Sequence, residues 1–224
     1  MEAAQLVGTF EKPLYLSLDP LLCAHSRAGQ DACRNCLDLC PTGAIRPDGE
    51  HVDIDPLICA GCGSCAARCP SGAISFEDPP TVALMPRISR LAEAYAKAGG
   101  GTPRLLVHDR GFGSEMISLS ARYGRGLPAD VIPMDLERVS GFGHAEMLAA
   151  LACGFGAVDV LLAPTTEQEA LDQELALAKA LGGPSPALRL LEPTEPEALE
   201  NLLYGAEKAQ PPAPILPLGS RRQI

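Results

Sequence analysis

The spacing of the cysteines constrains this chain more than any other feature of its sequence. Eight of the nine cysteines lie between positions 23 and 69. One set forms the run C-x2-C-x2-C-x3-C-P, with Cys59, Cys62, Cys65, Cys69 and Pro70 at its fixed positions. Thiolates at this spacing hold [4Fe–4S] clusters. A zinc site needs only pairs of ligands, usually further apart, so the run predicts iron–sulfur chemistry.

The first half of the cysteine region repeats the second. Residues 19–23 (Asp-Pro-Leu-Leu-Cys) correspond to residues 55–59 (Asp-Pro-Leu-Ile-Cys), and residues 33–45 correspond to residues 62–74. The two offsets, 36 and 29 residues, differ by seven, which places an insertion within residues 24–32. Cys23 therefore occupies the first-ligand position although nine residues separate it from Cys33. Each half carries four cysteines.

Residues 16–76 resemble the two-cluster bacterial-type ferredoxins at all eight cysteine positions, apart from the seven-residue insertion. The resemblance implies a pseudo-twofold α+β domain, in which each Pro-[Thr/Ser]-Gly-Ala-Ile segment turns into a short strand. In that family the fourth cysteine of each run binds the other cluster. The resemblance thus implies two [4Fe–4S] clusters, cluster I on Cys23, Cys33, Cys36 and Cys69, and cluster II on Cys59, Cys62, Cys65 and Cys40.

Charge and hydropathy narrow the class of partner. The chain has 18 basic and 28 acidic residues, a formal charge of −10. This balance disfavours nucleic acid and anionic membrane faces as partners, and favours protein surfaces. Residues 1–10 lack a basic segment followed by an apolar one, and the longest apolar stretch, residues 147–158, is about half a membrane span. We expect a cytoplasmic protein without membrane insertion.

The remainder of the chain predicts a different architecture. A helix over residues 86–98 ends at Gly99-Gly100-Gly101. Beyond it, short apolar strands are predicted at residues 104–109, 130–134, 157–163 and 187–191. Helices are predicted between and after them, at residues 114–123, 144–153, 166–181 and 195–204. Such alternation predicts a parallel α/β sheet of the flavodoxin-like or Rossmann-like kind.

Two Gly-Phe-Gly loops fall where α/β sheets bind ligands, beyond the carboxyl ends of the strands. They are residues 111–113 and 141–143, and each precedes a predicted helix. Neither completes G-x-G-x-x-G, because Met116 and Glu146 replace the third glycine. We therefore favour turns and helix caps over a flavin or nucleotide phosphate site. Phe112 and Phe142 would form an apolar docking patch if both are exposed, but burial is the favoured fate of each.

Other reactive side chains have simpler interpretations. His108 and His144 flank the same predicted sheet edge, but neither has an acidic partner at metal-ligand spacing. Cys153 ends an Ala- and Leu-rich helix and is expected to be a small core residue. The acidic residues within 167–174 are expected to form the solvated face of their helix. No catalytic residues are predicted.

Residues 104–182 show a second resemblance, to the delta subunit of methyl-viologen-reducing hydrogenase. Residues 139–141 and 152–162 carry it. That family passes electrons from hydrogenase or formate dehydrogenase to heterodisulfide reductase. Where members of that family have cysteines, this chain has Val139, Ala163 and Pro164. The resemblance therefore implies a domain that docks a partner without binding a further cluster. The fusion as a whole resembles iron–sulfur proteins associated with molybdenum formate dehydrogenases.

The predicted organisation has four segments. Residues 1–80 form the two-cluster domain, 81–102 a linker helix with its Gly-rich end, 103–205 the α/β domain and 206–224 a Pro-rich tail. We expect an electron-transfer protein that relays single electrons between a cytoplasmic oxidoreductase and an acceptor. The oxidoreductase would be of formate dehydrogenase or hydrogenase type. We expect the chain to be a carrier or a subunit of such a complex rather than a stand-alone enzyme. The alternatives are an enzyme subunit whose α/β domain binds a flavin or nucleotide, and a redox sensor or assembly factor. Ser220-Arg221-Arg222-Gln223-Ile224 resembles the first turn of a helix, which predicts that the natural chain continues.

Overall fold

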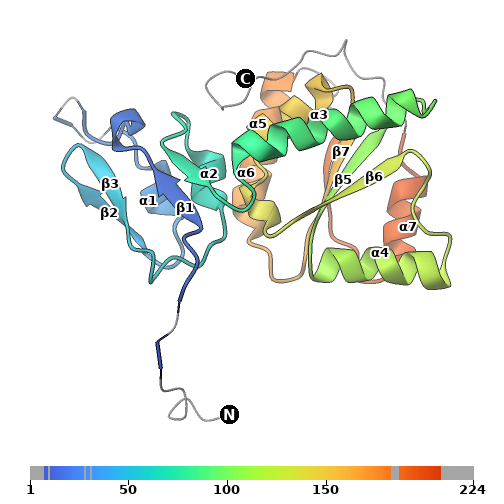
Figure 1. The fold of residues 1–224 in the computed structure, drawn as a ribbon, viewed down its shortest axis with the longest axis horizontal. Helices are drawn as coiled ribbons and strands as arrows, with labels where there is room; N and C mark the ends of the chain where they lie inside the picture. Colours follow the sequence, from blue (N-terminus) through green and yellow to red (C-terminus); the bar gives the residue numbers. More distant parts are fainter. Residues whose placement is uncertain (1–7, 10, 28, 31, 183–186, 208–224) are drawn as a thin grey trace.

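The fold is seen in a computed structural model, which describes residues 8–9, 11–27, 29–30, 32–182 and 187–207. The expected continuation past residue 224 lies outside the described residues. Figure 1 shows two parts, a small one with short elements and a larger one built around a sheet. The small part contains β1 (Leu16–Leu18), η2 (Pro20–Leu22), α1 (Asn35–Leu39), β2 (Ile45–Asp48), β3 (His51–Ile54), α2 (Ser64–Arg68) and β4 (Ile74–Phe76).

The strands of the small part pair across the sequence repeat. β1, which precedes the first cysteine run, lies antiparallel to β4, which follows the second, with Leu16 opposite Phe76. β2 follows the first run and pairs with β3, which precedes the second, with Ile45 opposite Ile54. Each repeat therefore pairs both of its strands with strands of the other. Apolar side chains from both repeats, including Ile45 and Ile74, share one core with the cysteines.

Helix α3 (Thr81–Lys97) connects the two parts and begins five residues before the start predicted from Pro86. Pro80 sits at its N-cap, and the carbonyl of Pro80 accepts hydrogen bonds from the amides of Ala83 and Leu84. Pro86 lies within the helix on its exposed side. The opposite side of α3 is buried in the core of the larger part, through Leu84, Met85, Ile88 and Ala92.

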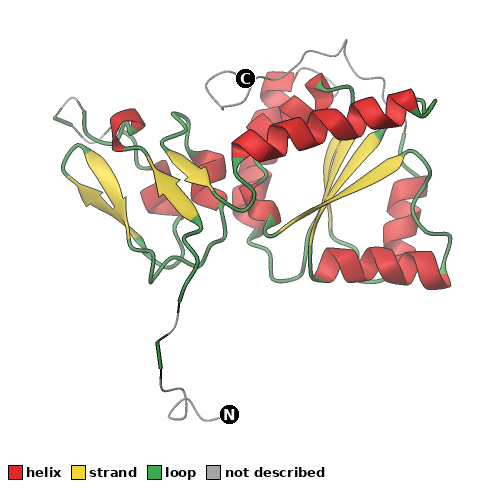
Figure 2. Cartoon of the chain, in the orientation of Figure 1, coloured by secondary structure: helices red, strands yellow, loops and turns green. Residues whose placement is uncertain are grey.

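The larger part is a parallel sheet between two layers of helices, as predicted (Figure 2). Its strands β5 (Arg104–Asp109), β6 (Val131–Leu136), β7 (Ala157–Leu161) and β8 (Leu188–Leu191) lie in the order β6-β5-β7-β8. One face is covered by α3, α5 (His144–Ala152) and α6 (Gln168–Gly182), and the other by α4 (Phe112–Tyr123) and α7 (Pro196–Tyr204). A short turn of helix, η3 (Val139–Gly141), follows β6. Pro133, which has no amide hydrogen, is tolerated because β6 is an edge strand.

Separate cores lie on the two faces of the sheet. Leu105, Val107 and Val160 point to the side of α3, α5 and α6, whereas Leu106 and Leu161 point to the side of α4 and α7. Both faces of the strands are therefore buried, which explains their near-continuous apolar sequences. Within the described ranges, no helix is both long and apolar enough to span a membrane.

Candidate iron–sulfur site

The eight clustered cysteines gather into two groups of four. The Cys36 thiol lies near enough to Cys69, Cys33 and Cys23 to interact with them electrostatically. The second group surrounds Cys65 and contains the other thiols, Cys40, Cys59 and Cys62, which line one small cavity with it. Each group thus takes one cysteine from the opposite repeat. Cys65 also interacts with Cys36, so the groups are neighbours.

The central thiols of both groups resist ionisation. Burial, followed by repulsion from the neighbouring cysteines, raises the pKa of Cys36 from 9.0 to about 11. Burial also raises the pKa of Cys65, with Cys62 as the largest neighbouring contribution. Four crowded thiolates need a positive centre between them, and metal loading therefore releases protons. A [4Fe–4S] core meets this requirement through one iron per thiolate.

A hydroxyl group lies close to the sulfur of the fourth cysteine of each run. Burial alone would raise the pKa of Cys40, but hydrogen bonds from the Thr42 side chain and from backbone amides, including that of Ala44, outweigh it and lower the pKa. The Thr42 hydroxyl is 3.6 Å from the Cys40 sulfur. In the second repeat, the Ser71 hydroxyl is also 3.6 Å from the Cys69 sulfur. Donors directed at thiolate sulfur fit a cluster, whose sulfurs accept such bonds.

A buried histidine closes the inserted loop of the first repeat. His25 is 2% exposed, and its Nδ1 lies 2.9 Å from the carbonyl oxygen of Cys33. Its own carbonyl accepts hydrogen bonds from the amides of Ala32 and Cys33. These contacts hold His25 next to Cys33, at the far end of the inserted stretch. Sequence reasoning missed His25, because a single histidine in an insertion has no spacing signal.

The two parts of the molecule meet beside Cys62. The Ser140 hydroxyl, in η3, donates a 2.6 Å hydrogen bond to the carbonyl of Cys62. Next to it, the backbones of Gly63 and Gly141 approach so closely that a Cβ on Gly63 would lie 3.0 Å from the Cα of Gly141. Gly63 also has φ +82°, a left-handed conformation that favours glycine. The second cysteine loop therefore packs directly on the larger part.

A buried carboxylate provides a second link between the parts. Glu174 on α6 lies 3.1 Å from Arg68 of α2, and it also accepts hydrogen bonds from the His144 amide and from Nδ1 of His144, at 3.1 and 2.5 Å. Only 2% of Glu174 is exposed. The prediction that Glu174 belongs to a solvated face is therefore wrong. His144 has an acidic partner that no sequence spacing indicates, because Glu174 is thirty residues away along the chain.

The histidines do not form a shared site. His108 is buried, with Nδ1 2.9 Å from the carbonyl of Asp109, whereas His144 is held by Glu174. Among the residues that the structure describes, no three His, Cys, Asp or Glu side chains lie close enough to hold a single metal ion. The thiolates of a [4Fe–4S] cluster bind four different irons and stand further apart than the ligands of one ion.

The Gly-Phe-Gly loops act as helix caps. At the start of α4, the Asp109 carboxylate accepts a 3.3 Å hydrogen bond from the Gly113 amide. At the start of α5, Glu146 accepts one of 2.9 Å from the Gly143 amide. Carboxylates of the chain itself thus occupy amides that a phosphate would use, as the cap interpretation predicts. Phe142 is fully buried, so a docking patch shared with Phe112 does not form.

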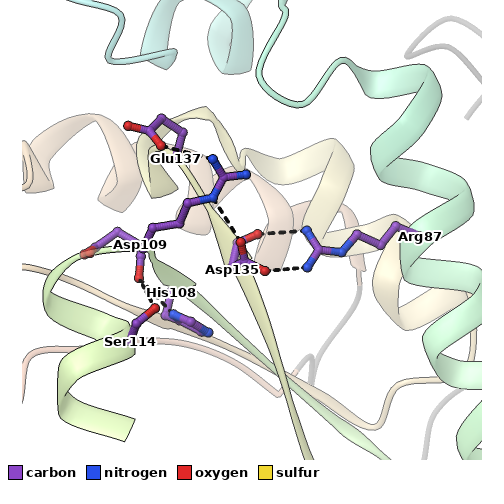
Figure 3. A network of polar contacts seen from close by, with 7 residues as sticks. Arg87, His108, Asp109, Ser114, Asp135 and Glu137 are labelled. Carbon is purple, nitrogen blue, oxygen red and sulfur yellow. Dashed lines mark hydrogen bonds and ion pairs between the residues drawn. The ribbon is translucent and has the colours of Figure 1, made fainter. Parts of the chain in front are cut away.

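An ion-pair network lies at the carboxyl edge of the sheet (Figure 3). Asp135, near the end of β6, binds Arg87 of α3 at 2.6 Å and Arg110 at 3.0 Å. Arg110 also reaches Glu137 at 3.3 Å. The hydrogen bond from Arg87, which outweighs burial, and that from Arg110 lower the pKa of Asp135 to about 2. The network fixes the β5–α4 and β6–η3 loops relative to α3.

The ninth cysteine stands apart from the other eight. Cys153 is the C-cap of α5, partly buried, and packs against the core beneath α3. Burial raises its pKa despite a hydrogen bond from Ser89 that lowers it. A thiol that is protonated and packed among apolar residues contributes to the core.

Comparison with known proteins supports iron–sulfur chemistry in the cysteine region. Residues 31–73 match the 4Fe-4S dicluster domain family. The chain is 39% identical to an uncharacterized ferredoxin of Methanocaldococcus jannaschii over 59 residues. This aligned segment covers 26% of this chain and 32% of that protein. It is 51% identical over 45 residues to the pyruvate synthase subunit PorD of Methanothermobacter marburgensis, covering 20% of this chain and 52% of that protein. It is 36% identical over 80 residues to the hydrogenase-4 component A of Escherichia coli, covering 36% of this chain and 37% of that protein.

The small part is thus a ferredoxin-type [4Fe–4S] domain. The matched region spans between about a third and half of the length of these relatives. No solved structure matches the chain.

Proposed function

We propose that this protein is an electron carrier or the electron-transfer subunit of an oxidoreductase complex. Cys23, Cys33, Cys36 and Cys69 would hold cluster I, and Cys59, Cys62, Cys65 and Cys40 would hold cluster II. Each [4Fe–4S] cluster, when bound, stores and releases one electron at a time. The protein would then relay single electrons and would not be a stand-alone enzyme.

The observation that carries this proposal is the proximity of two four-cysteine groups in one small domain. Cys65 interacts electrostatically both with its own group and with Cys36 of the other. A purely structural metal site needs one group only. Two adjacent redox centres suit stepwise electron transfer, because each step crosses a thin layer of protein.

The larger part would dock the electron donor or acceptor. Its strand order β6-β5-β7-β8 is that of the first four strands of flavodoxin-like sheets, which supports assigning it to that fold. Two of the relatives are, by name, a pyruvate synthase subunit and a hydrogenase component. Together with the resemblance of residues 104–182 to a hydrogenase delta subunit, these names support a partner of hydrogenase or formate dehydrogenase type.

The decisive experiment is metal analysis combined with electron paramagnetic resonance of the protein purified without oxygen. We expect about eight irons per chain and, after reduction, the signal of two interacting [4Fe–4S] clusters. A count of about four irons, or zinc in place of iron, would contradict the two-cluster assignment. Resolved flavin bands in the visible spectrum would favour the enzyme-subunit alternative. Affinity capture from native cells would then identify the partner.

A further inference from the structure

A cavity of about 480 Å³ lies where the larger part meets the second cysteine loop. Most of its wall comes from the carboxyl ends of β5, β6 and β7 and the loops after them: residues 109–112, 137–140, 163 and 165–167. Ala60 and Cys62 complete the wall from the ferredoxin-type domain, and Cys62 is the only one of the eight clustered cysteines that lines it. Open α/β sheets bind their ligands at this edge. The cavity has the volume of an ordinary ligand site.

The polar groups around the cavity do not favour a phosphate. The amide of Gly113, at the start of α4, already donates to Asp109. Arg110 is shared between Asp135 and Glu137, with both of which it forms ion pairs. A phosphate entering here would have to displace carboxylates from these donors. A nucleotide or flavin phosphate is therefore a poor occupant.

The charges of the wall favour a cation instead. It carries three carboxylates, Asp109, Glu137 and Glu167, against two guanidinium groups, Arg110 and Arg138. The Oδ2 atom of Asp109 is buried and has no hydrogen-bond partner, which is costly for a carboxylate. The neighbouring domain adds negative charge, because residues 1–80 contain 5 basic and 11 acidic residues before any thiolate is counted. These charges would attract a positive group to the cavity.

We propose that this cavity receives the positively charged tip of a protein redox partner, a lysine or arginine on a basic surface loop, and holds it against Cys62. The inference rests on the proposed electron-transfer function and deepens it by naming the contact point and the partner's charge. The partner's chain would then lie beside Cys62, which is only partly buried. Ser140 and Gly63 fix the loop around Cys62 to the cavity wall.

The test uses two inert complexes of the same shape and opposite charge. The cation is hexaamminecobalt(III) and the anion is hexacyanocobaltate(III). In the oxidised holoprotein, we expect the cation to shift the nuclear magnetic resonance signals of the backbone amides of residues 111 and 165–167. The anion should leave these signals unchanged. Thr165→Trp, which fills the cavity without altering charge, should abolish these shifts. Thr194→Trp is the matched control, because Thr194 is exposed and lies outside the cavity wall. Stronger shifts with the anion, or shifts that survive in Thr165→Trp, would overturn the inference.

A charge variant and a kinetic measurement complete the test. Glu167→Gln should weaken binding of the cation about threefold at low salt, and the effect should fade as salt is added. Asp172→Asn removes one charge from the exposed face of α6 and should leave binding unchanged. The dithionite-reduced protein should give one electron to hexaammineruthenium(III), forming hexaammineruthenium(II), severalfold more slowly in Thr165→Trp than in Thr194→Trp. Equal rates would contradict docking at Cys62.

The two proposals fail in different ways. A protein without a reducible cluster would give no electron to any acceptor, which would remove the proposed function. Cation binding in the cavity is measured independently on the oxidised protein. Normal electron transfer with no cation-dependent shifts would leave the proposed function standing and remove the docking site.

Discussion

The Ser140 hydroxyl donates its hydrogen bond to the backbone carbonyl of Cys62, across the boundary between the two parts of the molecule. The donor is 7% exposed and belongs to a short helical turn that follows an edge strand of the sheet. The acceptor belongs to a candidate cluster ligand. The α/β part therefore positions the cysteine loop directly, by a hydrogen bond to the main chain of that loop.

Replacing Ser140 by alanine should weaken this boundary. The Cys62 carbonyl would lose its donor in a poorly hydrated position, so the free energy of unfolding should fall by about 1–3 kcal/mol. Chemical denaturation followed by circular dichroism measures the change. Ser118→Ala is the matched control, because Ser118 also donates to a carbonyl, that of Ser114, but is exposed. Equal stabilities of the two variants would show that the bond across the boundary contributes nothing.

Gly63→Ala should be more damaging than an equivalent change elsewhere. Gly63 and Gly49 both have positive φ, +82° and +62°, so alanine costs about 1–2 kcal/mol at either position. Only at Gly63 would the new Cβ also meet backbone, the Cα of Gly141 at 3.0 Å, which adds about 1 kcal/mol or more. Thermal unfolding should separate the two variants. A larger loss in Gly49→Ala would refute the close packing.

The contribution of Glu174 and its partners, Arg68 and His144, to the stability of the fold should depend on pH. Burial would raise the pKa of Glu174, but hydrogen bonds from His144 and Arg68 outweigh it, so the folded pKa lies below the ordinary value. The carboxylate therefore stabilises the fold above the unfolded pKa, and this contribution is lost as the pH falls through the folded pKa. Glu174→Gln should cost about 2 kcal/mol near neutral pH, since Arg68 is partly exposed. The difference from wild type should shrink below about pH 4.3, as urea titrations over a pH series would show.

Cys23→Ser should remove about half of the iron, because the repeat assigns Cys23 to one cluster only. Iron and acid-labile sulfide per chain are the measurements. The remaining paramagnetic signal should lose the splitting that arises from two interacting clusters. Retention of about eight irons would exclude Cys23 as a ligand.

Cys153→Ser should keep the full iron content and the full paramagnetic signal. The Cys153 thiol packs against the core near α3, and burial raises its pKa, so iodoacetamide should modify it slowly at neutral pH. Mass spectrometry of the alkylated holoprotein follows this reaction. Cluster loss in the variant would give Cys153 a role that its position does not suggest.

Much of the fold was predictable because the relevant patterns are local. The strand at Arg104–Asp109 was predicted with its observed bounds, and the helix over His144–Ala152 to within one residue. The start of α3 was not, because Pro86 was interpreted as a helix start, although the capping carbonyl belongs to Pro80. A proline pattern alone does not show which residue caps the first turn.

The contacts between the two parts were not predictable from the cysteine spacing or from the alternation of strands and helices. Glu174 lies among acidic residues that are mostly exposed, and its burial is explained by Arg68, 106 residues away, and His144, 30 residues away. Ser140 and Cys62 are likewise 78 residues apart. Such pairs depend on how two separately patterned domains pack, which no single periodicity encodes.

The reciprocal pairing of β1 with β4 and of β2 with β3 has a consequence for the ancestry and synthesis of the domain. A chain with only one of the two repeats would leave both its strands unpaired, unless a second copy supplied the missing strands. The present arrangement is therefore what results when two such copies are fused head to tail. During translation, β1 emerges first, but it can pair with β4 only after Ile74–Phe76 has left the ribosome.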